Sequence, residues 1–422
     1  MKLSTVIRIL IDRYWKPKLR HTYWLFSAFA KETETLLLHP DTSLRRHARL
    51  DLIRYAFGLV KPVTGQTGER ARAAADWLLR AQTACPDDGV SLGYFPVNGS
   101  YQGWKPSYPE TTGYIITSLL QYSRQFGDVR AREAAIKMAY WEIAVQMPSG
   151  AVQGGPVTSP DRQTPAAFNT GMVLDGWCSA FQETQYPAFI DAARMAADFL
   201  VNDLDEDGYF KTNGEYVSVG EIKTYTCLCA WALYRFGVLV NDRRYCDGAI
   251  RSIDAALRQQ QSNGWFAHNC LSRSDAPLTH TIGYALQGIL EVGVLSGRKD
   301  FIESVRRGVE PLLANITHNG FLPGCFYADW EPASFSSCLT GSAQIAVVFF
   351  RLAEVTGEAR YAASANQLLD FLKSLQAMDL SNPALNGAIG GSFPLLGEYM
   401  RSGYPNWATK YLLDAILIQA TI

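Results

Sequence analysis

The chain has 422 residues, of which 48% are apolar, and a chain of this length and composition can bury a core too large for disorder to be expected. Its 39 basic and 40 acidic residues leave a formal charge of -1, which excludes a general electrostatic attraction to nucleic acid or to an anionic membrane. We therefore expect no nucleic-acid partner and a neutral or weakly charged ligand.

Residues 1–65 are predicted to form a helical extension ahead of the main domain. The chain begins MKLSTVIRILIDRYWKPKLRHTYWLF, in which Arg8, Asp12 and Arg13 interrupt the apolar residues before a signal-peptide core reaches its usual length. No run in the chain approaches the roughly 20 apolar residues of a membrane span, so we expect no transmembrane segment. The basic, Trp-containing arm is a candidate docking element for a protein partner.

A repeated pattern fills residues 66–422. Each repeat contains a polar or glycine-rich loop, an apolar helix, a short break, an amphipathic helix and a turn with glycine and an aromatic residue. The turns read GVSLGYF, DEDGYF, SNGWF and HNGFL. The first helix of each repeat is apolar on nearly every face, which predicts a buried inner helix. These inner helices are expected to begin near Glu110, Asn169, Lys223, His280, Ser337 and Asn406.

The second helices are amphipathic and predict an outer layer. They are expected to begin near Val129, Ala188, Asp242, Lys299 and Ala359. Each of the first five inner helices is thus followed by an outer helix, and the sixth inner helix ends the chain. The outer helix that would complete the sixth pair is ERARAAADWLLRAQ, which stands at the front of the domain. A chain that starts with an outer helix and ends with an inner one can pair its two ends. The sequence therefore predicts an all-α fold, an (α/α)6 toroid of six helical hairpins with an N-terminal helical extension.

In such a toroid all inner helices run the same way, so their N-termini gather at one mouth. Unpaired backbone amides and the positive ends of the helix dipoles converge there. The predicted catalytic residues at this mouth are Glu110, His280, Glu221, Asp329 and Glu331. The predicted substrate-binding residues are Trp104, Tyr108, Asn169, Lys223, Tyr225, His268, Tyr327, Trp330, Tyr404, Asn406, Trp407 and Lys410.

Several of these residues have an ordinary structural explanation as well. Asn169 and Asn406 are residue types that cap helices, and Glu110 follows Pro109 as a first-turn acid that the helix dipole favours. His280 is different, because a titratable ring at the start of a wholly apolar helix must face the pore or a gap between helices.

The loop YADWEP offers a second group of candidates. Asp329 and Glu331 flank Trp330, a mixture of carboxylates and stacking rings that is common at sugar sites. A solvated loop is the alternative explanation. The two explanations stay open from the sequence.

The acidic turn NDLDEDGYF has the opening spacing of a calcium loop, with Asp203, Asp205 and Asp207 at alternate positions. The acid expected at the end of the loop is replaced by Gly214, and the turn coincides with an ordinary hairpin junction. We therefore predict no metal site. The eight cysteines lack paired zinc spacing and indicate reduced thiols in a cytoplasmic protein.

Six hairpins closed by GYF or GWF turns resemble the six-hairpin glycosidase superfamily, from about Glu69 to the end of the chain. This superfamily includes glycoside hydrolases, unsaturated glucuronyl hydrolases, toroidal polysaccharide lyases and sugar 2-epimerases. The phrases PETTGY and PLTHTIGY also resemble those of uncharacterised proteins of bacterial exopolysaccharide and lipopolysaccharide gene clusters. The resemblance implies an oligosaccharide or polysaccharide ligand in the mouth.

Two kinds of chemistry follow from this resemblance. Hydrolysis needs a protonated acid and a second carboxylate. The candidates for that pair are Glu110, Glu221, Asp329 and Glu331. A lyase or epimerase needs a base that removes a proton next to a carbonyl or carboxylate, for which His280, His268 or Tyr225 would serve.

The paired-histidine motif of the 2-epimerases and a complete hydrolase signature are both unmatched. We predict a carbohydrate-active enzyme of glycoside hydrolase or polysaccharide lyase type that uses no cofactor. Two alternatives stay open. The chain is a non-catalytic glycan-binding or polysaccharide-assembly protein, or a terpenoid cyclase-like enzyme, for which QQQSNGWF resembles part of a Gln and Trp repeat although the DxDD acid motif is missing.

Overall fold

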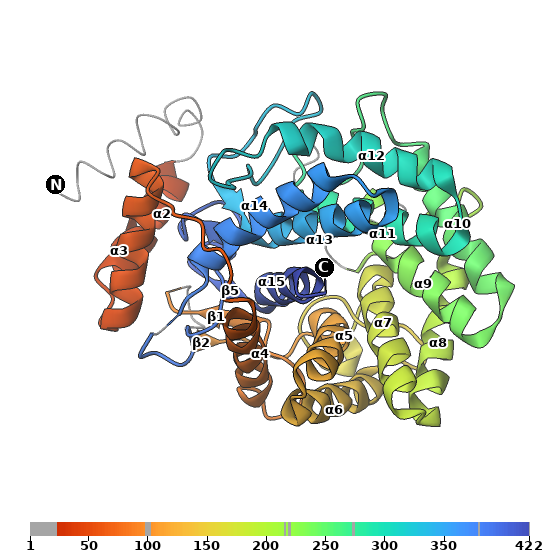
Figure 1. Ribbon diagram of the computed structural model, residues 1–422. Coiled ribbons are helices and arrows are strands. Elements are labelled where there is room, and N and C mark those ends of the chain that lie inside the picture. Colours follow the sequence, from red (N-terminus) through yellow and green to blue (C-terminus); the bar gives the residue numbers. More distant parts are fainter. Residues whose placement is uncertain are drawn as a thin grey trace.

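The computed structural model describes residues 23–97, 103–214, 217, 221–271, 275–378 and 380–421. The N-terminal arm predicted as a docking element lies largely outside these residues. Two layers of helices form a ring, with the inner helices surrounded by the outer ones (Figure 1). The predicted all-α toroid is therefore confirmed.

The inner helices begin within a few residues of their predicted starts. Glycines let them approach closely, because a Cβ atom at Gly113 of the first inner helix would lie 2.6 Å from the Cα of Val173 in the second. The predicted start near Lys223 is a short turn of 3-10 helix, after which the α-helix begins at Cys227. The inner helices are α5 (Pro109–Phe126), α7 (Ala167–Thr184), α9 (Cys227–Val240), α11 (Thr279–Ser296), α13 (Leu339–Thr356) and α15 (Asn406–Gln419).

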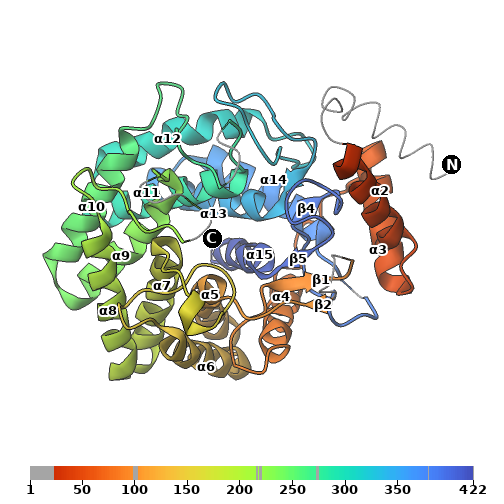
Figure 2. The ribbon, with the colours of Figure 1, turned by 180° about the vertical axis from the view of Figure 1, so that it is seen from behind.

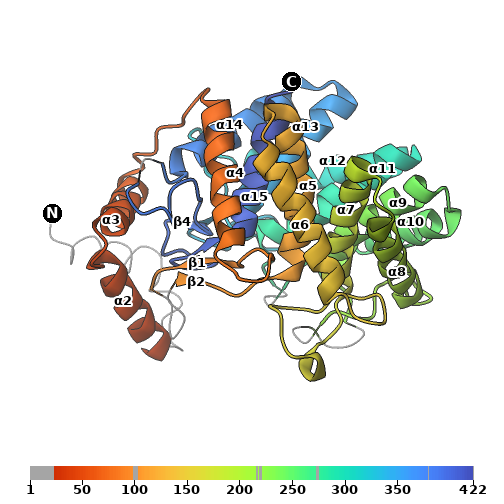
Figure 3. The ribbon, with the colours of Figure 1, turned by 90° about the horizontal axis from the view of Figure 1, so that it is seen from below.

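The outer helices run beside them and carry most of their charged residues toward solvent, with Glu142 of α6 and Lys373 of α14 among the buried exceptions. Figure 3 shows the two layers side by side, with the short strands at one end of the helices. The outer helices are α4 (Thr67–Thr83), α6 (Val129–Val145), α8 (Pro187–Asp203), α10 (Arg243–Leu257), α12 (Lys299–Ala314) and α14 (Ala359–Leu375).

The ends of the toroid pair as the repeat predicts. Helix α15 packs against α4 and α5 as well as against its predecessor α13. The amide of Gln125 in α5 donates to the backbone oxygen of Leu417 in α15 at 3.1 Å, and Lys373 of α14 donates to the side chain of Gln419 at 2.8 Å. The bond between Gln125 and Leu417 and the packing of α15 on α4 and α5 close the ring, whereas the bond of Lys373 joins the consecutive helices α14 and α15.

Short strands join the loops at the end of the ring where the inner helices begin. One sheet has the order β2 (Gly103–Trp104), β1 (Gly93–Phe95) and β5 (Tyr404–Pro405). The second pairs β3 (Ser337–Cys338) with β4 (Ser392–Phe393). The first sheet connects the loop before the first inner helix with the loop before the last, so it also closes the ring at its mouth.

Two helices precede the toroid, α2 (Tyr23–Leu37) and α3 (Thr42–Phe57), and they lie together at one side of the ring (Figures 1 and 2). Helix α3 is attached through specific hydrogen bonds. The amide of Leu395 donates to Asp51 at 2.5 Å, and the hydroxyl of Tyr55 donates to the backbone oxygen of Phe335 at 2.6 Å. The division of the chain near residue 65 into separate units stays a prediction.

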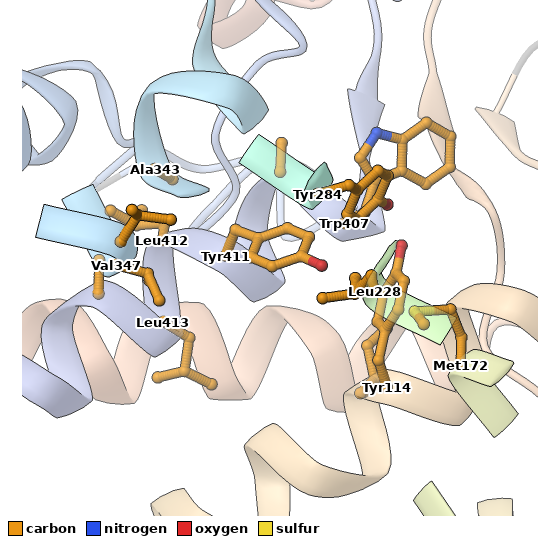
Figure 4. Close-up of a cluster of buried hydrophobic side chains, with 14 of the residues drawn as sticks. Tyr114, Met172, Leu228, Tyr284, Ala343, Val347, Trp407, Tyr411, Leu412 and Leu413 are labelled. Atoms are coloured by element: carbon orange, nitrogen blue, oxygen red, sulfur yellow. The ribbon is translucent and has the colours of Figure 1, made fainter. Parts of the chain in front are cut away.

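The centre of the ring is filled with side chains. Tyr114, Tyr284 and Tyr411 converge there with Met172 and Leu228 (Figure 4). Tyr284 lines a cavity on the mouth side, whereas the other four line a cavity at the opposite end. This cluster of Tyr114, Met172, Leu228, Tyr284 and Tyr411, which we call the tyrosine layer, therefore separates two chambers.

One described helix, α13, is long and apolar enough to cross a membrane by length and composition alone. It is an inner helix of the ring and is largely buried by its neighbours. Its composition is therefore that of a core helix. The eight cysteines all lie in the described part of the chain and are all free thiols.

Candidate functional site

A cavity of about 260 Å³ opens where the inner helices begin. Six of the residues predicted from the sequence line it, although they come from five of the inner helices or the segments directly before them. These residues are Tyr108, Glu110, Asn169, Tyr225, His280 and Trp407. The sequence-based expectation that the mouth gathers residues from distant repeats therefore describes a real cavity; their roles stay predictions.

Glu110 stands in the first turn of α5, directly after Pro109. Proline suits this position because its fixed φ is already helical and it lacks an amide hydrogen that would otherwise stay unpaired. The hydroxyl of Tyr108 donates to Oε2 of Glu110 at 2.6 Å. Desolvation nevertheless outweighs this bond and raises the pKa of Glu110 to about 7. The carboxyl is therefore a proton donor near neutral pH.

His280 is the second residue of α11 and is buried among the inner helices. Its Nδ1 lies 2.7 Å from Oε1 of Gln344 in α13, and a carbonyl oxygen can only accept, so the hydrogen is assigned to Nδ1. Gly283 brings the two helices together, since a Cβ there would lie 2.8 Å from the Cβ of Gln344. Burial lowers the pKa of His280 to about 4. The ring is therefore neutral near pH 7, with the lone pair on Nε2.

The walls of the cavity are aromatic. The ring of Phe168 packs against Tyr225 at 5.3 Å and against Tyr284 at 4.7 Å between ring centroids. The indole of Trp407 donates to the hydroxyl of Tyr399 at 2.8 Å and meets the ring of Tyr108 edge-on. Such rings offer flat apolar faces and polar edges, which is a suitable environment for the CH and OH groups of a sugar.

Asn169 fixes the loop rather than capping its helix. Its amide nitrogen donates to the backbone oxygen of Gln153 at 2.9 Å, and no side-chain cap bond is made at the start of α7. Asn406 behaves in the same way. It donates to the backbone oxygen of Ser91 at 2.8 Å and to the hydroxyl of Thr111 at 2.7 Å, and it is buried behind the cavity wall. The capping explanation is therefore wrong for both residues.

The loop YADWEP does not reach the cavity. Asp329 and Glu331 are exposed, and Asp329 accepts from the backbone amide of Glu331 within the turn. Trp330 anchors this turn by packing on Trp265, with ring centroids 5.2 Å apart, and Tyr327 lies on the same turn. The loop is part of the segment that connects the outer helix α12 to the inner helix α13. These four residues do not line the cavity, because the buried Trp330 holds the loop against Trp265.

Glu221 and Lys223 pair with each other at 2.7 Å instead of lining the cavity. The ammonium of Lys223 is buried and also lies 3.8 Å from the sulfur of Cys270. His268 is exposed and supports the same segment through its backbone oxygen, which accepts from Thr224. None of the three lines the cavity.

The remaining predicted residues are also outside the cavity. Trp104 packs on Trp77 and Tyr94, with centroid distances of 5.3 and 5.4 Å, so it is part of the sheet at the mouth. Tyr404 is fully buried in β5. Lys410 lies on the other side of the tyrosine layer and pairs with Asp414 at 2.7 Å.

The other twelve lining residues were not predicted from the sequence, and four of them have large side chains that bear on the site: Phe168, Tyr284, Tyr399 and Met400. Tyr284 lies four residues after His280 on α11 and could have been found, because that spacing puts it on the same helical face. Phe168 directly precedes Asn169. Tyr399 and Met400 come from the irregular segment before α15, where no periodicity shows which side chains point inward.

Within the described part of the chain no group of three or more histidine, cysteine, aspartate or glutamate side chains is arranged to hold a metal ion. Asp203 and Asp205 of the acidic turn hydrogen-bond to that turn and its surroundings. Asp205 accepts from the amide of Tyr209 at 2.8 Å, and Asp203 accepts from the amide of Thr212 at 3.0 Å. These bonds are those of a hairpin junction.

No protein-family model matches the sequence, and no curated protein matches it. Solved structures do match the fold. An unsaturated glucuronyl hydrolase specific for heparin is 12% identical with a TM-score of 0.68, over 84% of this chain and 97% of that one. The unsaturated glucuronyl hydrolase of Bacillus sp. GL1 is 16% identical with a TM-score of 0.65, over 83% and 96%.

A D-mannose isomerase is 12% identical with a TM-score of 0.65, over 84% of this chain and 97% of that one. These neighbours have the six-hairpin toroid that the sequence resembles, so the resemblance is confirmed for the fold. At such identities the likeness concerns the architecture alone.

Proposed function

We propose that the chain is a carbohydrate-active enzyme that isomerises or epimerises a sugar by acid–base proton transfer, with His280 as base and Glu110 as acid. The observation that carries the proposal is that a protonatable carboxyl and a neutral imidazole line one aromatic cavity at the mouth of the ring. Titratable groups displaced from their ordinary pKa in a cavity are typical of catalytic sites. Structural neighbours that act on sugars support a carbohydrate substrate.

The reaction is written for an open-chain aldose. His280 takes the proton from C2 while Glu110 gives its proton to the carbonyl oxygen on C1, and the C1–C2 double bond of an enediol forms. His280 then returns the proton to C1, and the carboxylate of Glu110 takes the proton of the C2 hydroxyl. This produces the ketose and restores both side chains. If the enediol instead turns over before the second transfer, His280 returns the proton to the opposite face of C2 while the carboxylate of Glu110 takes back the proton of the C1 hydroxyl, and the product is the epimeric aldose.

Hydrolysis by two carboxylates has less support. It requires a second carboxylate on the opposite side of the bond from the acid. Among the described residues that line the cavity, Glu110 is the only carboxylate, because Glu221, Asp329 and Glu331 lie elsewhere. The size of the cavity also favours a small substrate. Its 260 Å³ is below the roughly 300–1,000 Å³ of pockets that hold drug-sized ligands.

The test is proton exchange at carbon. Aldohexoses, ketohexoses and their N-acetylamino derivatives are incubated with the protein in D₂O, and deuterium at C1 or C2 is followed by NMR. The expected result is exchange and interconversion with at least one sugar. Glu110→Gln and His280→Asn should each reduce the rate by roughly 10²–10⁴ fold, the usual contribution of a general acid or base. Glu331→Gln, on the exposed turn, is the matched control and should retain the rate.

Other products would overturn the assignment. New reducing ends from an oligosaccharide without exchange at carbon would indicate hydrolysis. Ultraviolet absorbance from an unsaturated product would indicate elimination. Sugar binding without any reaction, unchanged in Glu110→Gln, would indicate a binding protein.

A further inference from the structure

A third cavity, larger than the two chambers of the ring, lies between α3 and the ring. Its volume is about 600 Å³. One wall is a face of α3, on which Ser43, Arg46, His47, Leu50 and Arg54 follow each other at helical spacing. The opposite wall comes from the start of α4 and from the segment that follows α14. We call this cavity the arginine groove.

The arginines of α3 divide into two groups. Arg45 donates to the backbone oxygen of His39 at 2.7 Å, and Arg49 donates to the backbone oxygen of Leu37 at 2.8 and 3.0 Å. These two therefore satisfy carbonyl groups at the end of α2. Arg46 and Arg54 line the groove instead, and they make no hydrogen bond or ion pair with the residues that the structure describes.

The ring contributes a third guanidinium, held in a fixed position. Arg70 donates to the backbone oxygen of Lys373 at 2.9 Å and to the side chain of Gln66 at 2.9 and 3.2 Å. Hydroxyl groups complete the lining from both walls. They belong to Thr42, Ser43, Ser374 and Ser381. All the charged groups among the described lining residues are thus positive.

We propose that the arginine groove binds a small ligand that carries two or more oxyanion groups, phosphate or carboxylate. Guanidinium groups match the oxygen pairs of both anions. The hydroxyl of Thr42 supplies a further donor, whereas Ser374 donates to the backbone oxygen of Phe371, and Ser43 and Ser381 bond to each other across the groove.

The guanidinium groups of Arg46 and Arg54 lie beside the fixed one of Arg70, and together they concentrate positive charge in a protein of nearly balanced charge. The buried carboxyl of Asp51 interacts electrostatically with Arg54 but does not line the groove. The volume fits a small molecule and exceeds what a single phosphate fills.

The groove is separate from the mouth. No residue lines both cavities, and α3 reaches the ring through loops rather than through the inner helices. The proposal therefore does not depend on the reaction at Glu110 and His280. Binding at the groove is measured without any substrate of the mouth.

Isothermal titration calorimetry with the full chain tests the groove. Pyrophosphate is the phosphate probe and digalacturonate is the carboxylate probe. At least one of them should bind, with an affinity that falls as salt is raised. Arg46→Gln and Arg54→Gln should each weaken that binding by about tenfold or more, since a hydrogen bond to a charged group is lost. Arg49→Gln removes the same charge from the same helix outside the groove and should leave the affinity within about twofold.

Circular dichroism of each variant separates lost binding from lost structure, and Arg54→Lys separates charge from paired hydrogen bonding. Lysine keeps the charge but cannot form the planar pair, so it should bind more weakly than arginine and more tightly than glutamine. The proposal is overturned if neither probe binds. It is equally overturned if Arg49→Gln weakens binding as much as Arg46→Gln, since the effect would then come from the overall charge of α3.

Discussion

The two chambers of the ring treat charge in opposite ways. At the C-terminal end of the inner helices, in a cavity of about 330 Å³, acids face bases. Asp175 of α7 pairs with Arg235 of α9, and Glu291 of α11 pairs with Arg351 of α13 at 2.7 Å. At the mouth Glu110 is held by a tyrosine hydroxyl, and none of the described residues that line that cavity is positively charged.

This difference separates structural charges from reactive ones. The ion pairs at the C-terminal end link neighbouring inner helices, so each charge that was taken from water gains a partner. Glu110 and His280 lose water without gaining a countercharge, and burial shifts their pKa values toward the neutral forms. The burial of Glu110 without a countercharge lowers the stability of the native state at pH 7. Its benefit is an acid and a base that are both uncharged at one place.

The largest effect should come from replacing Glu110 with glutamine. The change removes the acid while keeping the shape, so turnover should fall by roughly 10²–10⁴ fold. Stability should not fall with it. The pKa of Glu110 is raised from 4.5 in the unfolded chain to about 7, so the native state binds the proton more tightly and loses stability as pH rises from 4.5 to 7.

Glutamine does not titrate, so Glu110→Gln should be at least as stable as the wild type at pH 7, and the advantage should shrink toward pH 4. Urea denaturation at both pH values measures this. A variant that is inactive and also much less stable at pH 7 would contradict a catalytic role and point to a structural one.

The matching substitution at the C-terminal end of the inner helices should reduce stability and leave turnover unchanged. Asp175→Asn leaves Arg235 without its partner in a mostly buried position, which should reduce the free energy of unfolding by about 3 kcal/mol. Turnover by the folded protein should be retained, because the tyrosine layer separates the pair from the mouth. The double variant Asp175→Asn with Arg235→Gln should regain part of the loss. Additive losses would show that the pair contributes nothing.

The pH profile is the third and a smaller effect. The working forms are protonated Glu110 and neutral His280. Since their pKa values are about 7 and about 4, kcat/KM should be highest between these values. Above pH 7 it should fall about tenfold per pH unit as Glu110 ionises. Activity that rises through pH 7 would instead make the carboxylate the working form, and Glu110 a base.

The fold was predictable because the order and polarity of the helices in each repeat determine it. Hairpins whose inner helices are apolar all round, with an outer helix first and an inner helix last, leave a closed ring as the arrangement that buries every inner face. Closure itself rests on contacts between α15 and the first hairpin, and the position of ERARAAADWLLRAQ in the sequence was enough to predict them.

The site was predictable only in part. Glu110 and His280 could be found because they begin inner helices, and position along a helix decides which end of the ring they face. Lys410 shows the limit of this reasoning. It lies only four residues into α15, yet a rise of about 1.5 Å per residue is enough to carry it past the tyrosine layer into the other chamber.

The positions of loop residues could not be predicted for a different reason. Trp330 looks like a stacking ring for a ligand, but its indole packs on Trp265 and donates to the backbone oxygen of Asn263 at 3.0 Å. That contact joins segments more than sixty residues apart and fixes where Asp329 and Glu331 lie. Local composition cannot show which partner a loop aromatic has, so the sequence could not show that the carboxylates beside it lie away from the cavity.

The smallest effect should come from the one bond that favours ionised Glu110. The hydroxyl of Tyr108 donates to its carboxylate at 2.6 Å and thereby lowers a pKa that burial raises. Tyr108→Phe removes the donor and keeps the ring against Trp407, so the pKa of Glu110 should rise further. The descending high-pH limb of kcat/KM should move upward by less than about one pH unit, the equivalent of a single hydrogen bond.

Tyr225→Phe is the control for that shift. It removes another hydroxyl from the same cavity, one that makes no hydrogen bond to Glu110, and the limb should stay in place. A downward shift in Tyr108→Phe would mean that the tyrosine stabilises the protonated acid. Hydrogen bonding as well as burial would then keep Glu110 neutral. Both causes would distinguish it from the ion-paired carboxylates at the C-terminal end of the inner helices.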